Sequence, residues 1–585
     1  MDFARRCHEI VARPGVAPGE RLAELLRATW AWEMEEFPER ATWHGFPGQN
    51  HRFSDRSRAA IERRRGDLAA PLSAARALPR AELSAADQLN LDLFVRECEQ
   101  SIEESRWPFE LLCITQMDGV HQDPVQLLAA APAATAKDRA DLIARLAALP
   151  TLIDQSLELL REGLARGVTP PQMTLRDVPA QIAALLPSEP LESPLLAPIV
   201  DAAALADAQE TGAAARGAGE RLKREAAALL RERIAPRLRA LHDFVEQRYL
   251  PGARTTTAWR DLPDGEAWYA FKVREQTTTR LTPREIHQIG LDEVARLRAA
   301  LEATVRASGF AGDFAAFCDF LRTDPRFYCT SAEQLLSEYR DFCKRVDPQL
   351  VKLVKKLPRL PYGVCEVPAF SAESQTMAYY LPGSHEAGRP GWFYANTSKL
   401  ESRPRWEMEA LSLHEAVPGH HLQLALAAEL DLPDFRRHGG CNAYVEGWAL
   451  YSEALGYEMG FYQDAYSRFG QLSYEMWRAI RLVVDTGLHA LGWTRQQALD
   501  YFAANTGKPL HDITVEVDRY IVWPAQALSY KLGELAIWKL RRAAQQQLGA
   551  RFDLRDFHDE LLGEGALPLD LLEQRMTAWT ARQLR

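Results

Sequence analysis

The sequence predicts a mainly α-helical protein with one small β-sheet, and three observations lead to this prediction. Long stretches carry apolar residues three and four positions apart, the spacing that gathers them on one face of a helix. Only residues 360–397 are rich in short aromatic and β-branched runs broken by Gly and Pro, as strands are. Of the 585 residues, 47% are hydrophobic and 26% are charged, as in ordinary globular proteins.

The first 250 residues are predicted to form a helical N-terminal lobe. Four segments have the amphipathic helical pattern: 21–37, 85–105, 136–166 and 218–248. Residues 167–197 are rich in proline, which indicates a loop with short helical turns. Residues 251–585 are expected to form a second lobe that carries the catalytic site, joined to the first in one continuous unit.

The second lobe is expected to contain the strands. Residues 264–301 resemble one or two strands and a turn, followed by a helix that begins at Thr282-Pro283-x-Glu285. Within 360–397, the runs GVCEVPAF, TMAYYLPG and GWFYANTS predict a small antiparallel sheet. The helical pattern returns from residue 404 to the end.

Charge and cysteine content exclude several classes of protein. Lys and Arg total 70 against 80 Asp and Glu, so the net charge of −10 gives no attraction to nucleic acid or to an anionic membrane. No apolar run is long enough to span a bilayer, and the first residues lack the apolar stretch of a secretory signal. The eight cysteines form no C-x-x-C pair. We therefore expect a cytoplasmic protein with reduced thiols; the sequence does not predict its oligomeric state.

The most unusual segment is His414-Glu415-Ala416-Val417-Pro418-Gly419-His420-His421. In the regular zinc-peptidase helix a second histidine lies four residues after the first, but Pro418 occupies that position here. Proline clashes with the carbonyl of His414 and Gly419 is conformationally free, so the helix should bulge. The bulge can bring either His420 or His421 back toward His414. The alternative is that these are ordinary histidines near a turn.

A zinc site needs a third protein ligand and an open position. Glu446 and Glu453 are seven residues apart in NAYVEGWALYSE and share one face of a predicted helix. Carboxylates among apolar and aromatic side chains are costly to bury without a cation, which a metal would provide. The alternative is a pair of solvent-exposed glutamates.

Four blocks of sequence resemble a known family. HEAVPGHHLQ, YVEGWALYSE, DTGLHALGW and YIVWPAQALSYKLGE are similar, in this order, to the bacterial "domain of unknown function 885" family, whose members are regarded as zinc metallopeptidases. The resemblance implies a large two-lobed helical body around a deep cleft, like that of the gluzincin oligopeptidases and angiotensin-converting enzyme, that admits short peptides. It also implies that His414, His420 and Glu446 bind one zinc ion per chain, with Glu415 as the general base.

Other residues are candidates for supporting roles. His421, Glu453 and Asp485 could support a ligand or replace one. Tyr530 is our first candidate for the donor to the oxyanion and His489 the second, each against a role in helix packing. Candidates for substrate binding are Arg481 and Gln526, Lys531 as a partner of a substrate carboxylate, and Tyr394 and Asn396 beside the sheet edge, which could instead form a packed hairpin.

The sequence thus predicts a zinc metallopeptidase that cleaves short peptides through a water activated by zinc and Glu415. One alternative is a zinc hydrolase that acts on another small amide or on an ester. The other is a non-catalytic scaffold that retains the fold, although an intact Glu415 beside intact ligands argues against it.

Overall fold

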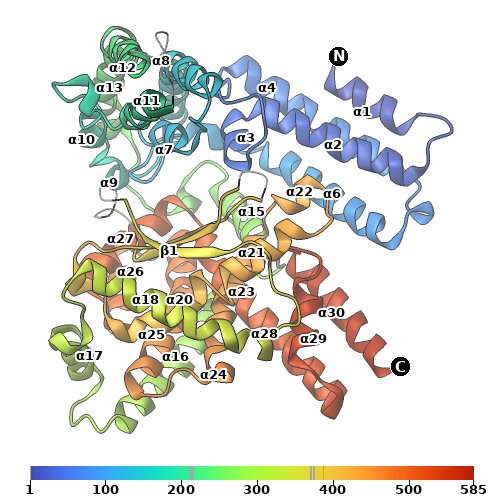
Figure 1. Ribbon diagram of the computed structural model, residues 1–585, viewed down its shortest axis with the longest axis vertical. Helices are drawn as coiled ribbons and strands as arrows, with labels where there is room; N and C mark the ends of the chain where they lie inside the picture. Colours follow the sequence, from blue (N-terminus) through green and yellow to red (C-terminus); the bar gives the residue numbers. More distant parts are fainter. Residues whose placement is uncertain (1, 210–216, 369–371, 373–375, 386–387) are drawn as a thin grey trace. The chain divides into compact units, whose positions relative to one another are not determined.

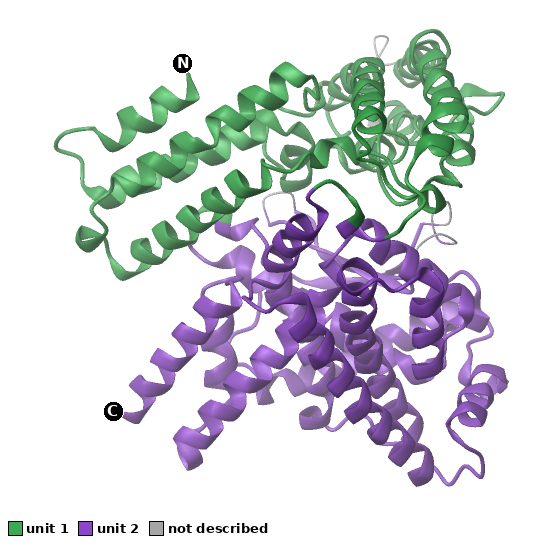
Figure 2. Ribbon diagram, turned by 180° about the vertical axis from the view of Figure 1, so that it is seen from behind, with its two compact units in different colours: residues 1–257, 261–263, 433–435 green, residues 258–260, 264–432, 436–585 purple. Residues whose placement is uncertain are grey.

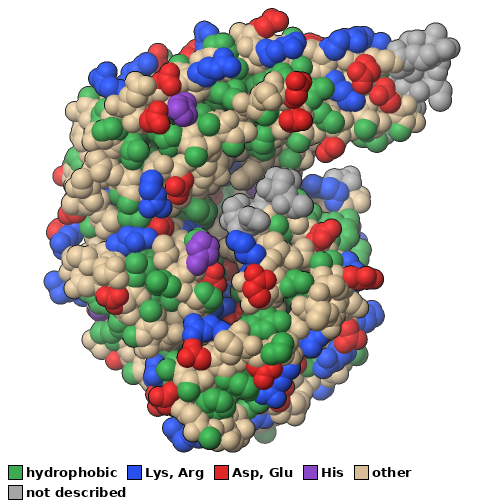
Figure 3. Space-filling model, turned by 90° about the vertical axis from the view of Figure 1, so that its left-hand side faces the viewer, with side chains coloured by type: hydrophobic (Ala, Val, Ile, Leu, Met, Phe, Trp, Pro, Cys, Tyr) green, Lys and Arg blue, Asp and Glu red, His purple; other side chains and the backbone are tan. Residues whose placement is uncertain are grey.

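The structure, a computed structural model, describes residues 2–209, 217–368, 372, 376–385 and 388–585 (Figure 1). It is mainly helical with one small sheet, as the sequence predicts. The chain divides into two compact units, one of residues 1–257, 261–263 and 433–435, the other of residues 258–260, 264–432 and 436–585 (Figure 2). Every helix in the described ranges is too short or too polar to span a bilayer. Acidic and basic side chains are interspersed over the face shown in Figure 3.

The N-terminal helices confirm the predicted segments. They are α1 (Phe3–Val11), α2 (Pro18–Glu36), α3 (Pro38–His44), α4 (Arg58–Asp67), α5 (Ala69–Arg76), α6 (Ala85–Glu104), α7 (Asp123–Ala130), α8 (Ala136–Arg166), α9 (Gln172–Leu175), α10 (Val178–Ala183), α11 (Ala197–Gln209), α12 (Ala218–Leu229), α13 (Ala235–Phe244) and α14 (Leu250–Gly252). Helix α8 begins at a capping box of Thr135 and Asp138 and ends at the left-handed Gly167. Its buried face, with Leu146 and Leu160, lies in the hydrophobic core of this unit.

The second unit contains the candidate site residues, which come from helices that lie apart in the sequence. Its helices, with the short α22, are α15 (Gly265–Thr277), α16 (Pro283–Ala307), α17 (Phe314–Thr323), α18 (Ala332–Val346), α20 (Met408–Glu415), α21 (His420–Glu429), α22 (Asp434–Arg437), α23 (Asn442–Ala454), α24 (Gly456–Met459), α25 (Ala465–Thr486), α26 (Arg495–Asn505), α27 (Leu510–Val522), α28 (Ser529–Leu548), α29 (Leu554–Leu562) and α30 (Leu569–Leu584). Helix α25 is buried over most of its length and packs against α16, α20 and α28.

One predicted element is wrong. The segment from Gly265 to Thr277, which we expected to be a strand, is helix α15. Its aromatic residues Trp268, Tyr269 and Phe271 are all buried, so burial in a helical core outweighs their preference for strands. The helix after it begins as predicted, because Thr282 and Glu285 form a capping box at the start of α16.

The sheet forms where predicted, but it is mixed rather than antiparallel. Its strands are β1 (Tyr362–Glu366), β2 (Ala378–Leu381) and β3 (Gly391–Ala395), in the order β1-β3-β2. Strand β2 pairs antiparallel with β3, whereas β1 pairs parallel with it. Strand β3 takes the centre and buries Gly391, Phe393 and Ala395 on one face. Strand β2 runs opposite to the other two, so the first and third strands run the same way as neighbours, with β2 on the other side of β3.

Two glycines let helices α23 and α28 cross at close range. A Cβ atom at Gly533 would lie 1.8 Å from the carbonyl oxygen of Ala443, and one at Gly447 would lie 2.5 Å from the Cα of Gly533. Both distances are far below van der Waals contact, so neither position has room for a side chain. Since α23 carries Glu446 and α28 carries Tyr530, this crossing fixes the spacing of two candidate site residues.

Replacing Gly533 with alanine should therefore destabilise the second unit. We expect a loss of about 1–3 kcal/mol or more in the free energy of unfolding, because the added methyl group must push the helices apart. Scanning calorimetry measures this as a lower unfolding temperature. The control is Gly66→Ala in α4, where a Cβ atom would meet nothing within 4 Å. An unchanged transition in Gly533→Ala would contradict the close crossing.

Candidate metal centre

The helix that carries His414 breaks where proline and glycine predict. Helix α20 ends at Glu415 and α21 begins at His420. A Cβ atom at Gly419 would lie 2.0 Å from the carbonyl oxygen of His414, so only glycine allows the chain to return this closely. The Pro418 carbonyl accepts a hydrogen bond from the Trp448 indole at 2.8 Å, which ties the break to α23.

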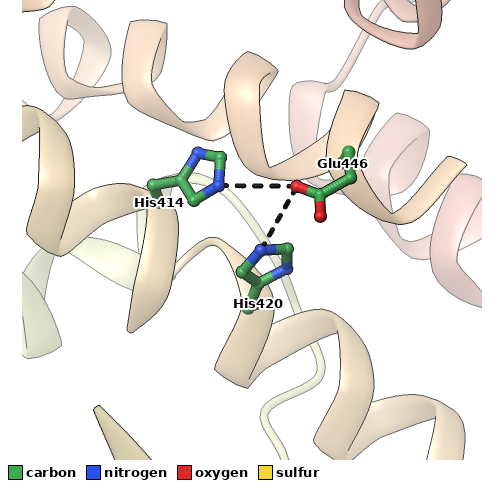
Figure 4. Close-up of side chains that lie close together, drawn as sticks. All are labelled: His414, His420 and Glu446. Atoms are coloured by element: carbon green, nitrogen blue, oxygen red, sulfur yellow. Dashed lines mark ion pairs between the residues drawn. The ribbon is translucent and has the colours of Figure 1, made fainter. Parts of the chain in front are cut away.

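The break gathers two histidines and a glutamate from three helices (Figure 4). The Nε2 atom of His414 lies 3.6 Å from Oε2 of Glu446, and the Nε2 atom of His420 lies 3.5 Å from the same oxygen. One donor atom from each of the three residues lies within 4.8 Å of the others. The structure thus brings together the three residues that the sequence proposes as ligands.

The donor set fits a zinc ion. Tetrahedral zinc with bonds of about 2.1 Å separates its ligand atoms by about 3.4 Å, close to the two distances observed between the histidines and Glu446. The Oε2 atom of Glu446 is buried and has no hydrogen-bond partner among the described residues. Burying a carboxylate oxygen without a hydrogen-bond partner costs free energy, and a cation between this oxygen and the imidazoles would remove that cost.

Glu453 orients the first histidine. Its Oε1 atom accepts a hydrogen bond from Nδ1 of His414 at 2.8 Å and lies 3.4 Å from the Arg478 guanidinium. Because a carboxylate only accepts, Nδ1 carries a proton, and Nε2, on the side of Glu446, is the nitrogen that could bind a metal ion once its own proton is lost. Glu453 is fully buried and contacts the side of the imidazole away from Glu446, so its place is that of a residue that orients His414 rather than that of a third donor in the cluster.

The charges of the site favour a cation. Burial lowers the pKa of His414, but the neighbouring carboxylates of Glu446 and Glu453 outweigh it and raise the pKa to about 9. Burial raises the pKa of Glu446, but His420 and His414 outweigh burial and lower that pKa far below its ordinary value. The two carboxylates therefore stabilise positive charge at this position, and a divalent ion would supply it.

Replacing Glu453 with glutamine should weaken zinc binding about 10- to 100-fold, the usual cost of losing a carboxylate behind a metal-bound histidine. The amide is neutral and makes the His414 imidazole a poorer donor to the metal. Titration against a chromophoric chelator measures the change. The control is Glu458→Gln, whose carboxylate pairs with Arg541. Equal zinc affinity in both variants would remove Glu453 from this role.

His421 faces away from the cluster, toward the sheet. Its Nδ1 atom accepts a hydrogen bond from the Tyr380 hydroxyl at 2.8 Å, and its ring packs against Tyr362. Burial lowers the pKa of His421 to about 4, so the imidazole stays neutral. Of the two histidines that the sequence left as alternatives, the structure thus places His420, and not His421, beside His414 and Glu446.

Two further candidates lie beside the cluster. Glu415 is the last residue of α20, directly after His414, and only 8% of its surface is exposed. Burial, and then the Glu446 carboxylate, raise the pKa of Tyr530, so its phenol stays protonated and can donate. Gln526 lies one turn before Tyr530, and its amide is 3.4 Å from the phenol oxygen.

Two candidates on α25 and the segment after it have structural roles instead. His489 has both ring nitrogens occupied by backbone, since Nδ1 accepts from the Trp259 N–H at 3.2 Å and Nε2 donates to the Tyr520 carbonyl at 2.9 Å. His489 is also fully buried, so the structure favours the alternative of helix packing over the predicted role as oxyanion donor. Asp485 likewise makes its hydrogen bonds away from the candidate ligands. Its carboxylate accepts from the Ala525 N–H at 3.0 Å and the Tyr269 hydroxyl at 2.6 Å.

Three predicted substrate-binding residues are also engaged elsewhere. Lys531 is fully buried, and its Nζ atom lies 2.6 Å from both Glu475 and Glu534, so it cannot meet a substrate. Asn396 is buried after β3, where its amide donates to the carbonyl of Ala372 at 2.7 Å. Tyr394 stacks on Tyr379 of the neighbouring strand, with ring centroids 4.9 Å apart. These contacts are those of a packed hairpin, which was the alternative prediction for this segment.

Several charged residues near the site are not predicted from the sequence. Arg478 contacts Glu453, and Arg519 and Glu516 of α27 form a bidentate pair near Tyr530. Arg478 lies three residues before Arg481, so both share one face of a largely apolar helix. That placement of a charge was a signal of a buried ion pair. For α27, the alternation of charged and apolar residues gave no such signal.

Solved structures with similar folds extend over nearly the whole chain. One is described as "the putative lipoprotein from Colwellia psychrerythraea"; it is 27% identical, with a TM-score of 0.89 over 97% of this chain and 100% of that one. Another, "a putative lipoprotein of unknown function from Shewanella oneidensis", is 17% identical, with a TM-score of 0.73 over 95% and 99% of the two chains. At that identity the likeness shows the fold alone. No curated protein matches the chain.

A family model gives the broader relationship. The model described as "Bacterial protein of unknown function (DUF885)" matches residues 38–576, which include most of both compact units and all the residues of the candidate metal centre. Because the match covers most of its length, the chain belongs to this bacterial family, DUF885, whose function is unknown.

Proposed function

We propose that the protein is a zinc-dependent hydrolase and that it acts as a metallopeptidase on short peptides. The observation that carries the proposal is the group of His414, His420 and Glu446, whose donor atoms all lie within 4.8 Å of one another, with Glu415 next to the first of them in the sequence. Two histidines and a glutamate leave a fourth position open, the arrangement of a catalytic rather than a structural zinc site.

In this proposal, each residue around the cluster has a separate role in hydrolysis. When bound, a zinc ion makes a water molecule more acidic and polarises a carbonyl group. Glu415 accepts the proton of the attacking water and returns it to the leaving amine. Tyr530 donates a hydrogen bond to the oxygen on which negative charge develops. Glu453 holds the His414 imidazole in the tautomer that leaves Nε2 free to coordinate.

A mixed peptide library tests this proposal. The purified chain is incubated with the library, with and without a chelator, and the products are identified by mass spectrometry. We expect cleavage of short peptides that disappears with chelator and returns when zinc is added. Cleavage of a non-peptide amide or ester alone would indicate the wider class of zinc hydrolase. Zinc binding with no turnover of any of these substrates would favour the non-catalytic scaffold.

A further inference from the structure

A second group of buried charges lies beside Tyr530, outside the metal cluster. Its members come from α25, α27 and the turn before α28, and they are Arg481, Glu516, Arg519, Tyr520 and Gln526. Each of the two arginines and Glu516 has only 8–9% of its surface exposed. Charged side chains are rarely this buried unless they are paired or serve a ligand.

The single carboxylate of this group is already saturated. The Oε2 atom of Glu516 accepts hydrogen bonds from Arg481 at 3.1 Å, Arg519 at 2.9 Å and the Tyr520 hydroxyl at 2.6 Å. Its Oε1 atom accepts from Nε of Arg519 at 3.3 Å. The Nη1 atom of Arg481 is buried and has no hydrogen-bond partner among the described residues. The group therefore has more donors than acceptors.

The group is also short of negative charge. Arginine stays protonated in proteins, so two guanidinium groups face one carboxylate and leave a net charge of +1. The next carboxylate, Asp485, accepts hydrogen bonds from the Ala525 N–H and the Tyr269 hydroxyl. Burial raises its pKa to about 7 despite the opposing effect of Arg519, so Asp485 supplies only part of a negative charge at neutral pH. Arg478 brings a further guanidinium near the Tyr530 ring and pairs with Glu453. An uncompensated buried charge is costly, and a bound anion would compensate it.

This positive group adjoins the proposed reaction site. The Arg481 guanidinium lies over the Tyr530 ring, 4.6 Å from its centroid. Gln526 connects the two regions, because it accepts from Arg519 at 3.0 Å and its amide lies 3.4 Å from the Tyr530 phenol. The phenol in turn is close enough to Glu446 for that carboxylate to raise its pKa. An anion held by the arginines would therefore sit next to the scissile bond.

We propose that Arg481 and Arg519 form a subsite for a carboxylate of the substrate, so that the enzyme prefers peptides with a free carboxylate close to the bond it cleaves. This inference rests on the proposed hydrolase function and adds the substrate class. A guanidinium presents parallel N–H groups that match the two oxygens of a carboxylate. The terminal carboxylate of a short peptide is such a group, whereas the interior of a long peptide offers it only through Asp or Glu.

The test compares N-acetyl-Ala-Ala-Ala with its C-terminal amide. For the zinc-loaded chain we expect kcat/KM to be at least about tenfold higher for the acid, the factor given by one charge-assisted hydrogen bond. In the chelated full chain, saturation-transfer NMR should show tighter binding of the acid by a similar factor. This second measurement reports on the subsite without turnover.

Two variants assign the preference to the arginine. Arg481→Met leaves Glu516 paired with Arg519, so the one remaining guanidinium balances the one carboxylate, and we expect the acid-to-amide ratio to fall to about one in both measurements. Arg495→Met, which removes a pair with Asp518 on the same helix as Arg519, should keep the wild-type ratio. Equal binding of acid and amide by the wild-type chain, or an unchanged ratio in Arg481→Met, would overturn the subsite. Turnover of neither peptide together with preferential binding of the acid would instead count against the hydrolase alone.

Discussion

Replacing His414 with alanine is expected to remove most of the zinc from the purified protein, which should otherwise contain about one zinc ion per chain. The variant leaves only His420 and Glu446, and two ligands do not complete a zinc site. The loss in affinity should exceed the roughly 10- to 100-fold loss expected for a supporting residue such as Glu453. Elemental analysis after gel filtration measures the zinc content directly.

The chain offers a matched control one residue from the second ligand. His421→Ala removes an imidazole from the same helix, but that imidazole contacts Tyr380 and Tyr362 and faces the sheet. We expect this variant to keep its zinc and His420→Ala to lose it. A zinc content of one per chain in His414→Ala, or zinc lost from His421→Ala, would show that the ion binds elsewhere.

Much of the fold follows from local sequence. Helices such as α6 and α8 carry their own apolar spacing and capping residues, so their ranges are predictable from a short window. The parallel pairing of β1 with β3 is not, because it depends on where the chain goes between β1 and β2. Helix α15 was misassigned for a related reason: its aromatic residues favour strands locally, and only the surrounding helices bury them.

In the candidate site too, some features follow from local sequence and others depend on distant segments. The break at Pro418 and Gly419 is a local effect of two residues, and it predicts that His420 or His421 returns toward His414. The choice of His420 and Glu446 as candidate ligands came from the family resemblance. Lys531 and His489 were misjudged because their partners come from distant segments: Glu475 for the lysine and the Trp259 N–H for the histidine. A polar residue on an apolar helix indicates that a partner exists, but not whether that partner is a substrate or the protein itself.

Replacing Glu415 with glutamine should abolish most hydrolysis and leave the zinc in place. The amide cannot take a proton from water, so the variant loses general base catalysis, which typically contributes about 10²- to 10⁴-fold to the rate. Its shape is nearly unchanged and it is not among the three clustered donors, so the zinc content should equal that of the wild type. The measurement is kcat for a peptide from the library, with zinc determined on the same sample.

The control for this variant is Glu409→Gln on the same helix. Glu409 accepts the Tyr462 N–H at 2.8 Å, a bond that glutamine can keep. Both variants exchange a largely buried glutamate of α20 for its amide, so any general effect on the helix is shared. A large loss of kcat confined to Glu415→Gln identifies proton transfer, because zinc and fold are the same in both proteins. Turnover at the wild-type rate in Glu415→Gln would assign the proton to another group and leave the cluster without its base.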